Sequence, residues 1–273
     1  MSRIVARNVW KEYGDQVVLE RVNLDIGERE FCTLVGASGC GKTTFLRLLL
    51  GQERPSRGEL LLDGRPWPAE PGPDRGVVFQ RYSVFPHLSV LDNVLLGLEL
   101  RRARLAGRLF GAARRRARDE AGKMLDAVGL GAARDKYPHM LSGGMQQRLA
   151  IAQSLVHRPR LLLLDEPFGA LDPGIRADMH RLIVGLWERS DTTVVMITHD
   201  LKEGFALGTR LLVFDKPRLD AQAPEAYGAT ITYDLPLGKR GAPPLETLSA
   251  ATARTAWFQH DMAAVRSSAA PTK

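Results

Sequence analysis

Alternating segments at the start of the chain predict a small β region. In Ile4–Val9 and Val17–Leu24, apolar and polar residues follow one another at roughly strand-like spacing, and Gly14-Asp15 stands between the two segments. Such alternation, interrupted by a turn pair, is typical of neighbouring strands in an antiparallel sheet. We therefore expect short strands, broken by turns, over residues 1–30.

Other apolar runs do not alternate, which suits strands buried on both faces of a parallel sheet. These runs are Phe31–Val35, Leu161–Leu164 and Thr193–Thr198. Each is followed directly by a candidate functional residue: Gly36, Asp165 and His199, respectively. Because ligands of open α/β sheets bind beyond the carboxyl ends of the strands, we expect these three residues to converge on one site.

Helical periodicity dominates the middle of the chain, from Val90 to Pro159. A further helix is expected over Phe45–Leu50, and short strands over Glu59–Asp63 and Val77–Phe79. Beyond Lys216 the patterns weaken, and the tail is rich in Ala, Pro and Gly. The tail predictions are a strand at Ile231–Tyr233, a short helix at Leu245–Phe258 and disorder over Arg266–Lys273.

Composition places the 273-residue chain among ordinary globular proteins, with 44% hydrophobic and 25% charged residues. The formal net charge of +7 comes from one segment, because Arg101–Arg118 contains eight Arg and no acidic residue. A general nucleic-acid-binding surface is therefore not expected. We interpret this run as a solvated helix face or loop, and contact with anionic lipid headgroups is the sharper alternative.

Two cysteines, Cys32 and Cys40, are too few for a disulfide scaffold, so both are expected to remain thiols in a reducing compartment. No signal-peptide pattern and no stretch of about 20 apolar residues is found in the sequence. The sequence thus predicts a cytoplasmic protein. If it works at a membrane, another subunit must supply the spans.

One segment carries a phosphate-binding pattern. Residues 36–43, Gly-Ala-Ser-Gly-Cys-Gly-Lys-Thr, fit G-x-x-x-x-G-K-[ST] between an apolar strand and a helix. Glycines let backbone N–H groups surround phosphate oxygens, and the start of the following helix adds the positive end of its dipole. Lys42 is expected to neutralise the β- and γ-phosphates, and the Thr43 hydroxyl to hold Mg²⁺. A glycine-rich turn that binds nothing is the alternative.

Two further segments gain meaning from their order along the chain. Asp165 suits a Mg²⁺ contact and Glu166 could polarise an attacking water, although a solvated strand end is the plainer interpretation. Residues 141–148, Leu-Ser-Gly-Gly-Met-Gln-Gln-Arg, offer a hydroxyl and free N–H groups at a helix start, which alone would be a simple cap.

Taken together, these segments resemble the ATP-binding subunit of an ABC transporter over roughly residues 1–215. The motifs that carry the resemblance follow in the family's order: 36–43, Gln80 in Val-Phe-Gln-Arg, 141–146, 161–167, 169–172 and His199 in Thr-His-Asp. The resemblance implies an α/β P-loop NTPase (ABC ATPase) core with an N-terminal antiparallel β subdomain and an inserted helical subdomain at about 81–158. Residues 216–273 would form a C-terminal extension, partly disordered.

The resemblance also implies roles for individual residues. Two subunits would pair head to tail, as a homodimer or with a paired ABC subunit, and each ATP would lie between one phosphate loop and the partner's Ser142, Gly143 and Gly144. Tyr13 would stack on adenine, Gln80 would sense Mg²⁺ and the lytic water, His199 would contact the γ-phosphate and orient Glu166, and Asp172 would couple the two sites. The remaining nucleotide contacts would come from Gly36, Ala37, Ser38, Gly39, Cys40, Gly41, Lys42, Thr43 and Thr44, with Lys42 also catalytic.

The motifs 137–139 and 166–172 are similar to those of the nitrate, sulfonate and taurine importer group, and residues 201–237 to subunits associated with urea-carboxylase genes. This likeness implies transmembrane permease subunits, an indirectly linked periplasmic substrate-binding protein, and a place on the cytoplasmic face of the inner membrane. The solute would be urea- or guanidine-like, nitrate or a sulfonate. At position 153 the family commonly has Arg and this chain has Gln, so a charge contact is expected to be missing.

Other function classes remain as alternatives. A soluble ABC ATPase acting on nucleic acid usually carries a long coiled-coil insertion between the phosphate loop and the signature, and the 100 positions between Lys42 and Ser142 leave no room for one. Translation-factor-like members have two cassettes in one chain, whereas one is found here. A regulatory subunit without turnover would not need Glu166 and His199. The predicted activity is therefore ATP hydrolysis coupled to solute import, with ATP and Mg²⁺ as ligands.

Overall fold

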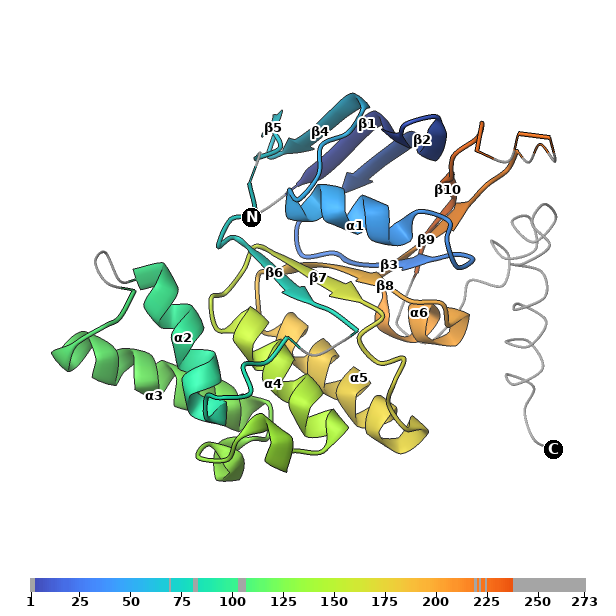
Figure 1. The fold of residues 1–273 in the computed structure, drawn as a ribbon. Helices are drawn as coiled ribbons and strands as arrows, with labels where there is room; N and C mark the ends of the chain where they lie inside the picture. The colour runs from blue at the N-terminus through green and yellow to red at the C-terminus, as the bar shows by residue number, and fades with distance from the viewer. Residues whose placement is uncertain are drawn as a thin grey trace, which may run out of the picture. The chain divides into compact units, whose positions relative to one another are not determined.

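The computed structural model describes residues 3–68, 70–80, 83–102, 107–218, 220, 222–223 and 225–237. The chain divides into two compact units, Met1–Pro71 with Thr193–Lys273, and Gly72–Thr192 (Figure 1). Each unit is described by itself. The expected helix at 245–258 and the expected disorder at 266–273 lie outside the described residues.

The first unit contains an antiparallel sheet with the strand order β2-β1-β4-β5. Its strands are β1 (Ile4–Tyr13), β2 (Gln16–Ile26), β4 (Arg57–Leu62) and β5 (Arg65–Pro66). A tight turn joins β1 to β2, and Gly14 adopts φ +58° there, a backbone angle that favours glycine. The alternating segments therefore form the N-terminal antiparallel region that the sequence predicts.

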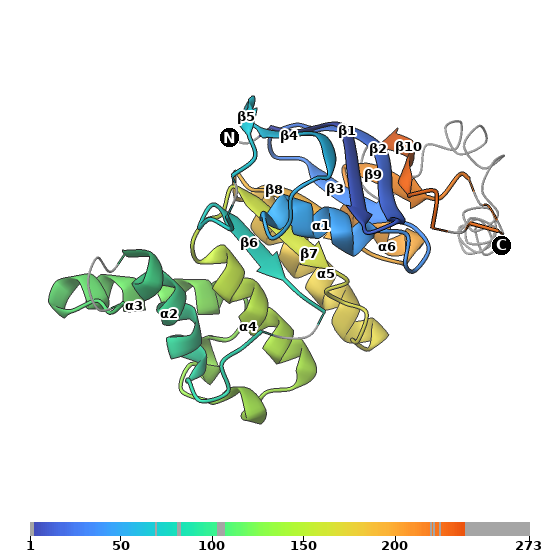
Figure 2. The same cartoon turned by 45° about the horizontal axis from the view of Figure 1, so that its top comes forward.

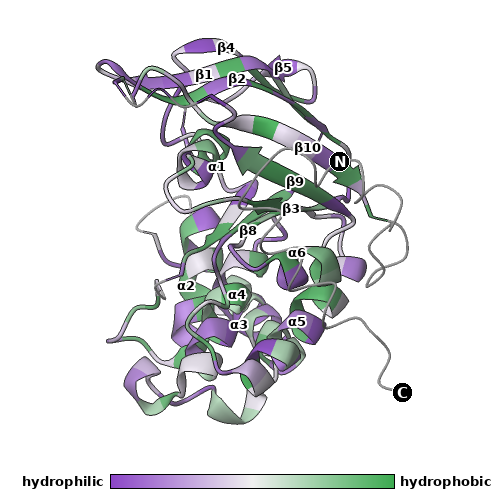
Figure 3. Cartoon of the chain, turned by 90° about the vertical axis from the view of Figure 1, so that its right-hand side faces the viewer, coloured by the Kyte–Doolittle hydropathy of each residue, from purple (hydrophilic) through white to green (hydrophobic). Residues whose placement is uncertain are grey.

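A second set of strands in the same unit follows the order β10-β9-β3-β8. Their bounds are β3 (Phe31–Val35), β8 (Thr193–Ile197), β9 (Arg210–Asp215) and β10 (Thr230–Pro236). Strand β3 pairs in parallel with both β8 and β9, and every residue of β3 and β8 is buried. Figure 3 shows the hydrophobic colouring along β3 and β9. Burial on both faces explains why these runs do not alternate.

Two helices belong to this unit, α1 (Lys42–Leu50) and α6 (Leu201–Leu207). Helix α1 ends at Gly51, whose φ of +78° lets its N–H return to the carbonyls of Arg47 and Leu48. The inward face of α1 is apolar, and the ring of Phe45 packs against Phe214 of β9 at a centroid distance of 5.4 Å. Figures 1 and 2 both place α1 beneath the antiparallel sheet.

The second unit combines two parallel strands with helices. Its elements are β6 (Arg75–Val78), α2 (Val90–Arg102), α3 (Gly111–Ala127), the short helices η1 (Gly131–Ala133) and η2 (Pro138–Met140), α4 (Gly143–Leu155), β7 (Leu161–Asp165) and α5 (Pro173–Glu188). Buried residues of α2, α3 and α4, among them Val94, Leu98, Leu125 and Leu149, form one hydrophobic core. The helical interpretation of Val90–Pro159 is confirmed.

Two further comparisons with the sequence concern the tail and membrane spans. Strand β10 pairs antiparallel with β9, so the expected strand at 231–233 exists and runs from Thr230 to Pro236. The domain boundary at 215 stays a prediction, and β10 lies beyond it. Within the described ranges, no helix has the length and apolar character needed to cross a bilayer.

Candidate functional site: a phosphate loop and a serine-capped signature

The segment 36–43, called here the phosphate loop, connects β3 to the first turn of α1. Gly41 is the N-cap of α1 with φ +88°, and Gly39 has φ +76°, which are left-handed conformations open to glycine at little cost. Among the described residues, no side chain caps the N-terminus of α1 with a hydrogen bond. The first N–H groups of α1 are therefore available to an anion, which is where the positive end of the helix dipole lies.

Close packing explains two of the glycines in the phosphate loop. A Cβ on Gly36 would lie 2.2 Å from the carbonyl oxygen of Phe214, and one on Gly41 would lie 2.8 Å from Cδ2 of Leu19. Both contacts are shorter than real Cβ atoms show. The backbone of the loop is thus wedged against β2 and β9.

Lys42 places a positive charge inside this loop. Its Nζ donates hydrogen bonds to the carbonyl oxygens of Gly36, at 2.7 Å, and Ala37, at 2.8 Å, and the residue is only 6% exposed. Cys40 lies beside it with Sγ 3.7 Å from Nζ, and burial raises the pKa of this thiol, so it stays protonated. The exposed residues of the loop are Ser38, Gly39 and Thr43, and Thr44 is half-buried.

His199 and the phosphate loop both follow the carboxyl ends of parallel strands, at the same edge. Leu34 of β3 pairs with Ile197 of β8, and the N–H of Thr198 donates to the Leu34 carbonyl at 3.1 Å. The chain leaves both strands in the same direction, towards Gly36 in one case and His199 in the other. Asp200, the next residue, caps α6 by accepting from the N–H of Lys202. The imidazole is exposed at the strand end.

Tyr13 lies at the end of β1 with 43% of its surface exposed. Its hydroxyl donates to the carboxylate of Glu53, and Nζ of Lys11 lies 4.8 Å from the ring centroid. Burial and the Glu53 carboxylate raise the pKa of the Tyr13 phenol. Glu53 also pairs with Lys11 at 3.0 Å and with Arg47 of α1 at 3.6 Å. An aromatic ring is thereby tied to the helix that follows the phosphate loop.

In the second unit, β6 and β7 bring another pair of predicted residues to one edge. The strands are parallel, with Val78 opposite Leu164, and the chain then continues to Gln80 and Asp165, respectively. Glu166 follows Asp165 with φ +46°, a conformation that is costly for a non-glycine residue. Such strained backbone tends to persist at functional positions, where surrounding structure fixes it.

The signature, residues 141–146, begins α4. Ser142 is the N-cap, and its Oγ accepts a hydrogen bond from the N–H of Met145 at 3.4 Å. A Cβ on Gly144 would lie 2.7 Å from Cγ2 of Ile175, in the first turn of α5, so this glycine allows the two helix starts to pack closely. Asp172 is the exposed N-cap residue of α5, and its side chain makes no cap hydrogen bond.

Sequence reasoning missed the buried partner of Gln153. Its Nε2 donates to the side-chain oxygen of Asn93 at 3.0 Å, and Asn93 is 1% exposed. An amide pair therefore stands at 153, where the sequence predicts that a charge contact is missing. The partner lies 60 positions away, and no local pattern points to it. The same holds for Glu53 as the partner of Tyr13.

The predicted site residues thus form two groups. The first unit carries Tyr13, the phosphate loop with Thr44, and His199; the second carries Gln80, Ser142, Gly143, Gly144, Asp165, Glu166 and Asp172. Within each unit, parallel strands bring some of them to a common edge. The oxygen donors of Thr43, Gln80 and Asp165 are of the kind that Mg²⁺ prefers.

Comparison with known proteins gives three kinds of match. A family profile described as ABC transporter matches residues 19–169. An ATP-binding protein of Brucella abortus is 40% identical over 93% of this chain and 92% of its own length. The aliphatic sulfonates import ATP-binding protein SsuB of Burkholderia pseudomallei is 41% identical over 86% of this chain and 64% of that protein.

The nitrate import ATP-binding protein NrtC of Synechococcus elongatus is 44% identical over 73% of this chain and 29% of that protein. Among solved structures, the dimeric post-hydrolysis state of the ATP-binding cassette MJ0796, bound to ADP and phosphate, matches with a TM-score of 0.67. It is 28% identical, and the match covers 86% of this chain and 99% of that one. The α/β P-loop fold class expected from the sequence is confirmed.

Proposed function

Because the chain belongs to the ABC transporter family of ATP-binding proteins, we propose that it hydrolyses ATP within a head-to-tail dimer to energise a bacterial solute importer. The observation that carries the proposal is the phosphate loop, whose wedged backbone holds the Lys42 ammonium at its centre. The signature offers a second helix start, where Ser142 caps α4. Two such sites in one chain suit a nucleotide shared between two copies.

The phosphate loop would hold the triphosphate. Backbone N–H groups at the start of α1 would donate to phosphate oxygens, and Lys42 would exchange its carbonyl partners for the β- and γ-phosphates. Tyr13, held by Glu53, would present its ring to the adenine. Binding in this loop relies on position and charge, which is what phosphoryl transfer demands of a protein.

Mg²⁺ would be held by the hydroxyl of Thr43, the amide of Gln80 and the carboxylate of Asp165. When bound, Mg²⁺ neutralises charge on the β- and γ-phosphate oxygens. Thr43 and Gln80 are exposed, so their oxygens are accessible to the ion. Gln80 lies two residues beyond the end of β6, and it would report the state of the nucleotide to the membrane partner.

Glu166 and His199 would serve the hydrolytic step. The Glu166 carboxylate would accept a proton from the attacking water, and His199 would hold the γ-phosphate and orient Glu166. Glu166 would act from a left-handed backbone position, with φ +46°, directly after β7. Substitution by Gln keeps the shape of this side chain and removes its ability to accept the proton.

The signature and Asp172 would act on the nucleotide of the second copy. The Ser142 hydroxyl and the N–H groups of Gly143 and Gly144 would donate to the γ-phosphate held by the partner's loop. Asp172, an exposed N-cap with no cap hydrogen bond, would cross the dimer interface. Hydrolysis then requires closure of the dimer, and closure can move a membrane partner.

Transmembrane permease subunits, contacted at the cytoplasmic face of the inner membrane, would be those partners, with a periplasmic substrate-binding protein linked through them. The proposed solute is urea- or guanidine-like, nitrate or a sulfonate. None of the site residues of this chain is assigned to the solute, because the proposed site contacts nucleotide alone.

The test of the proposal combines an assay with an affinity capture. We expect the purified chain to hydrolyse ATP with Mg²⁺, and Lys42→Ala to abolish turnover. From detergent-solubilised membranes of the native host, the tagged chain should retain a multi-span permease that mass spectrometry identifies. Retention of soluble or nucleic-acid-bound proteins alone, with the ATPase intact, would exclude the importer and favour the nucleic-acid-acting class.

A further inference from the structure

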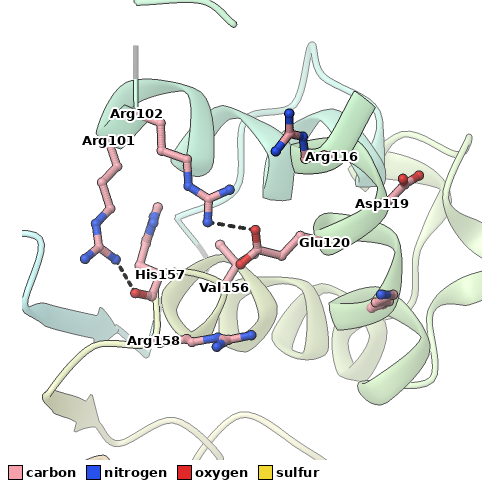
Figure 4. A pocket seen from close by; sticks show the side chains of 9 residues that line it. Arg101, Arg102, Arg116, Asp119, Glu120, Val156, His157 and Arg158 are labelled. Atoms are coloured by element: carbon pink, nitrogen blue, oxygen red, sulfur yellow. Dashed lines mark hydrogen bonds and ion pairs between the residues drawn. The ribbon is translucent and has the colours of Figure 1, made fainter. Parts of the chain in front are cut away.

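A basic cavity of about 670 Å³ lies in the second unit, and none of the residues assigned above lines it. Its walls come from the last turn of α2, one face of α3 and the segment that follows α4. The lining residues are Arg101, Arg102, Arg116, Asp119, Glu120, Lys123, Val156, His157 and Arg158. Figure 4 shows these side chains around the opening.

The charges that line the basic cavity do not balance. Five arginine or lysine side chains face two carboxylates. One carboxylate, Glu120, is already paired with Arg102 at 2.7 Å. The other, Asp119, is exposed and points away from the remaining side chains in Figure 4. The cavity therefore keeps a positive excess that its own residues do not neutralise.

Three of the cations are available to a ligand. Within the part of the chain that the structure describes, the side chains of Arg116, Lys123 and Arg158 make no hydrogen bond or ion pair. Arg116 and Lys123 are seven positions apart on α3 and so share one face of this helix. Arg158 follows α4, and its φ of +51° is unusual for a side chain of this size. Two separate elements thus contribute free donors.

The wall that carries His157 is fixed by contacts of its own. Arg101 donates to the His157 carbonyl oxygen, and the ring packs against Gly97, where an added Cβ would lie 2.5 Å from Nε2. The imidazole Nδ1 is buried and, among the described residues, has no hydrogen-bond partner. In Figure 4 the ring lies between Arg101 and Arg102. Contacts of Arg101 and of Gly97 thus hold His157 in this wall of the cavity.

From this arrangement we propose that the basic cavity binds a phosphate group, by the side chains of Arg116, Lys123 and Arg158. Guanidinium groups present planar pairs of N–H donors that match two phosphate oxygens, and lysine adds a compact charge. Two sources share this chemistry, a soluble phosphate compound and the headgroup of an anionic phospholipid. None of the residues that line the cavity belongs to the phosphate loop or to the other residues assigned to ATP, so this site uses a different set of side chains.

A matched pair of double variants tests the proposal. Arg116→Gln with Arg158→Gln removes two cations of the cavity. Arg115→Gln with Arg189→Gln removes the same charge from exposed positions of the same unit that do not line it. All four residues are exposed, so both variants should fold, which circular dichroism and thermal unfolding check. Both variants lose two positive charges, so an effect of net charge alone on the attraction of an anion would be the same in both.

The full chain, with ADP saturating the phosphate loop, is titrated with inorganic pyrophosphate by calorimetry. It is also sedimented with phosphatidylcholine vesicles that contain or lack phosphatidylglycerol. We expect the cavity variant to lose roughly tenfold or more in affinity for at least one probe, and the control variant to keep the affinity of the unchanged chain. Loss for pyrophosphate identifies a soluble ligand, and loss for vesicles alone identifies a lipid headgroup. Equal affinities of the two variants for both probes, or no binding by the unchanged chain, would overturn the proposal.

Discussion

Gln153 of α4 donates a hydrogen bond from its side-chain amide to Oδ1 of Asn93 in α2, over 3.0 Å. The amide of Asn93 in turn donates to the carbonyls of Phe85, Leu88 and Ser89, and its Oδ1 accepts from the N–H of Phe85. One buried side chain thus ties the segment 85–89, which follows Gln80 in the chain, to the helix that begins at the signature.

This network predicts a hierarchy of stability losses. Asn93→Ala should lower the free energy of unfolding by about 2–4 kcal/mol, because it leaves several buried backbone groups without partners. Gln153→Ala should cost about 1 kcal/mol, since it removes one donor from a half-buried place. Urea denaturation followed by circular dichroism measures both. Similar losses for the two variants, or additive losses in the double variant, would show that Asn93 is not the centre of this network.

A steric prediction concerns the phosphate loop. Gly36→Ala places a methyl group 2.2 Å from the Phe214 carbonyl oxygen, so we expect the loop to shift and ATP affinity to fall at least tenfold, the equivalent of about 1.4 kcal/mol. Fluorescent ATP analogues measure the affinity. Gly185→Ala is the control, because a Cβ at this position of α5 meets nothing within 4 Å. It should bind ATP as the unchanged chain does and gain up to about 1 kcal/mol of stability. An unchanged ATP affinity in Gly36→Ala would contradict the wedge.

A variant that removes the contact between Tyr13 and Glu53 should weaken adenine binding and leave phosphate binding unchanged. Removal of the carboxylate in Glu53→Ala should lower the pKa of Tyr13 and free its ring, because the Glu53 hydrogen bond is one of the causes that raise this pKa. We expect the dissociation constant for ATP to rise roughly three- to tenfold, within the range of about 0.5–1.5 kcal/mol for an aromatic contact. The dissociation constant for tripolyphosphate should not change.

The phenol titration of Glu53→Ala is read from tyrosinate absorbance, with Tyr13→Phe identifying the signal of Tyr13 among the five tyrosines. Equal weakening of ATP and tripolyphosphate binding would mean that Glu53 supports the phosphate loop as a whole and not the ring.

His157 gives a dependence of stability on pH. Burial, followed by the charges of Arg101 and Arg102, lowers the pKa of His157 below its usual 6.5, while Glu120 opposes them. Below pH 6.5 the unfolded chain binds a proton that the folded chain does not, so stability falls as the pH drops towards the folded-state pKa. Above pH 6.5 this residue adds no pH dependence.

His157→Asn should therefore flatten the slope of unfolding free energy against pH in the acidic range, by up to about 1.4 kcal/mol per pH unit. His139→Asn, at an exposed position, serves as the control. Parallel slopes for the unchanged chain and His157→Asn between pH 5 and 6.5 would contradict a buried, neutral imidazole.

The sequence predicts the elements well because their causes are local. Alternation gave β1 and β2, continuous apolar runs gave β3, β7 and β8, and the end of α1 was set by Gly51. The spacing of 36–43 and of Ser142 with its glycines was sufficient to predict the starts of two helices, α1 and α4. In each case the residue and its consequence lie within one element or at its end.

The sequence does not predict which residues far apart in the chain form hydrogen bonds with each other. Glu53 reaches Tyr13 across 40 positions, and Gln153 reaches Asn93 across 60. Such pairs depend on tertiary packing, which no local periodicity encodes. The described arginines of the run 101–118 are exposed, as a solvated face predicts. No local pattern shows, however, that Arg101, Arg102 and Arg116 line a cavity with Lys123 and Arg158. The cavity exists because residues from three segments meet.

The most direct test of the central claim is the molar mass of the Glu166→Gln variant, measured by size-exclusion chromatography with light scattering. With saturating ATP and Mg²⁺ the variant should have twice the monomer mass, because binding closes the dimer and hydrolysis cannot reopen it. With ADP the variant should stay a monomer, because ADP has no γ-phosphate for the signature to contact. With Ser142→Arg added it should also stay a monomer, since the changed signature could no longer contact the partner's γ-phosphate. A Glu166→Gln chain that remains monomeric in saturating ATP and Mg²⁺ would contradict the shared nucleotide site.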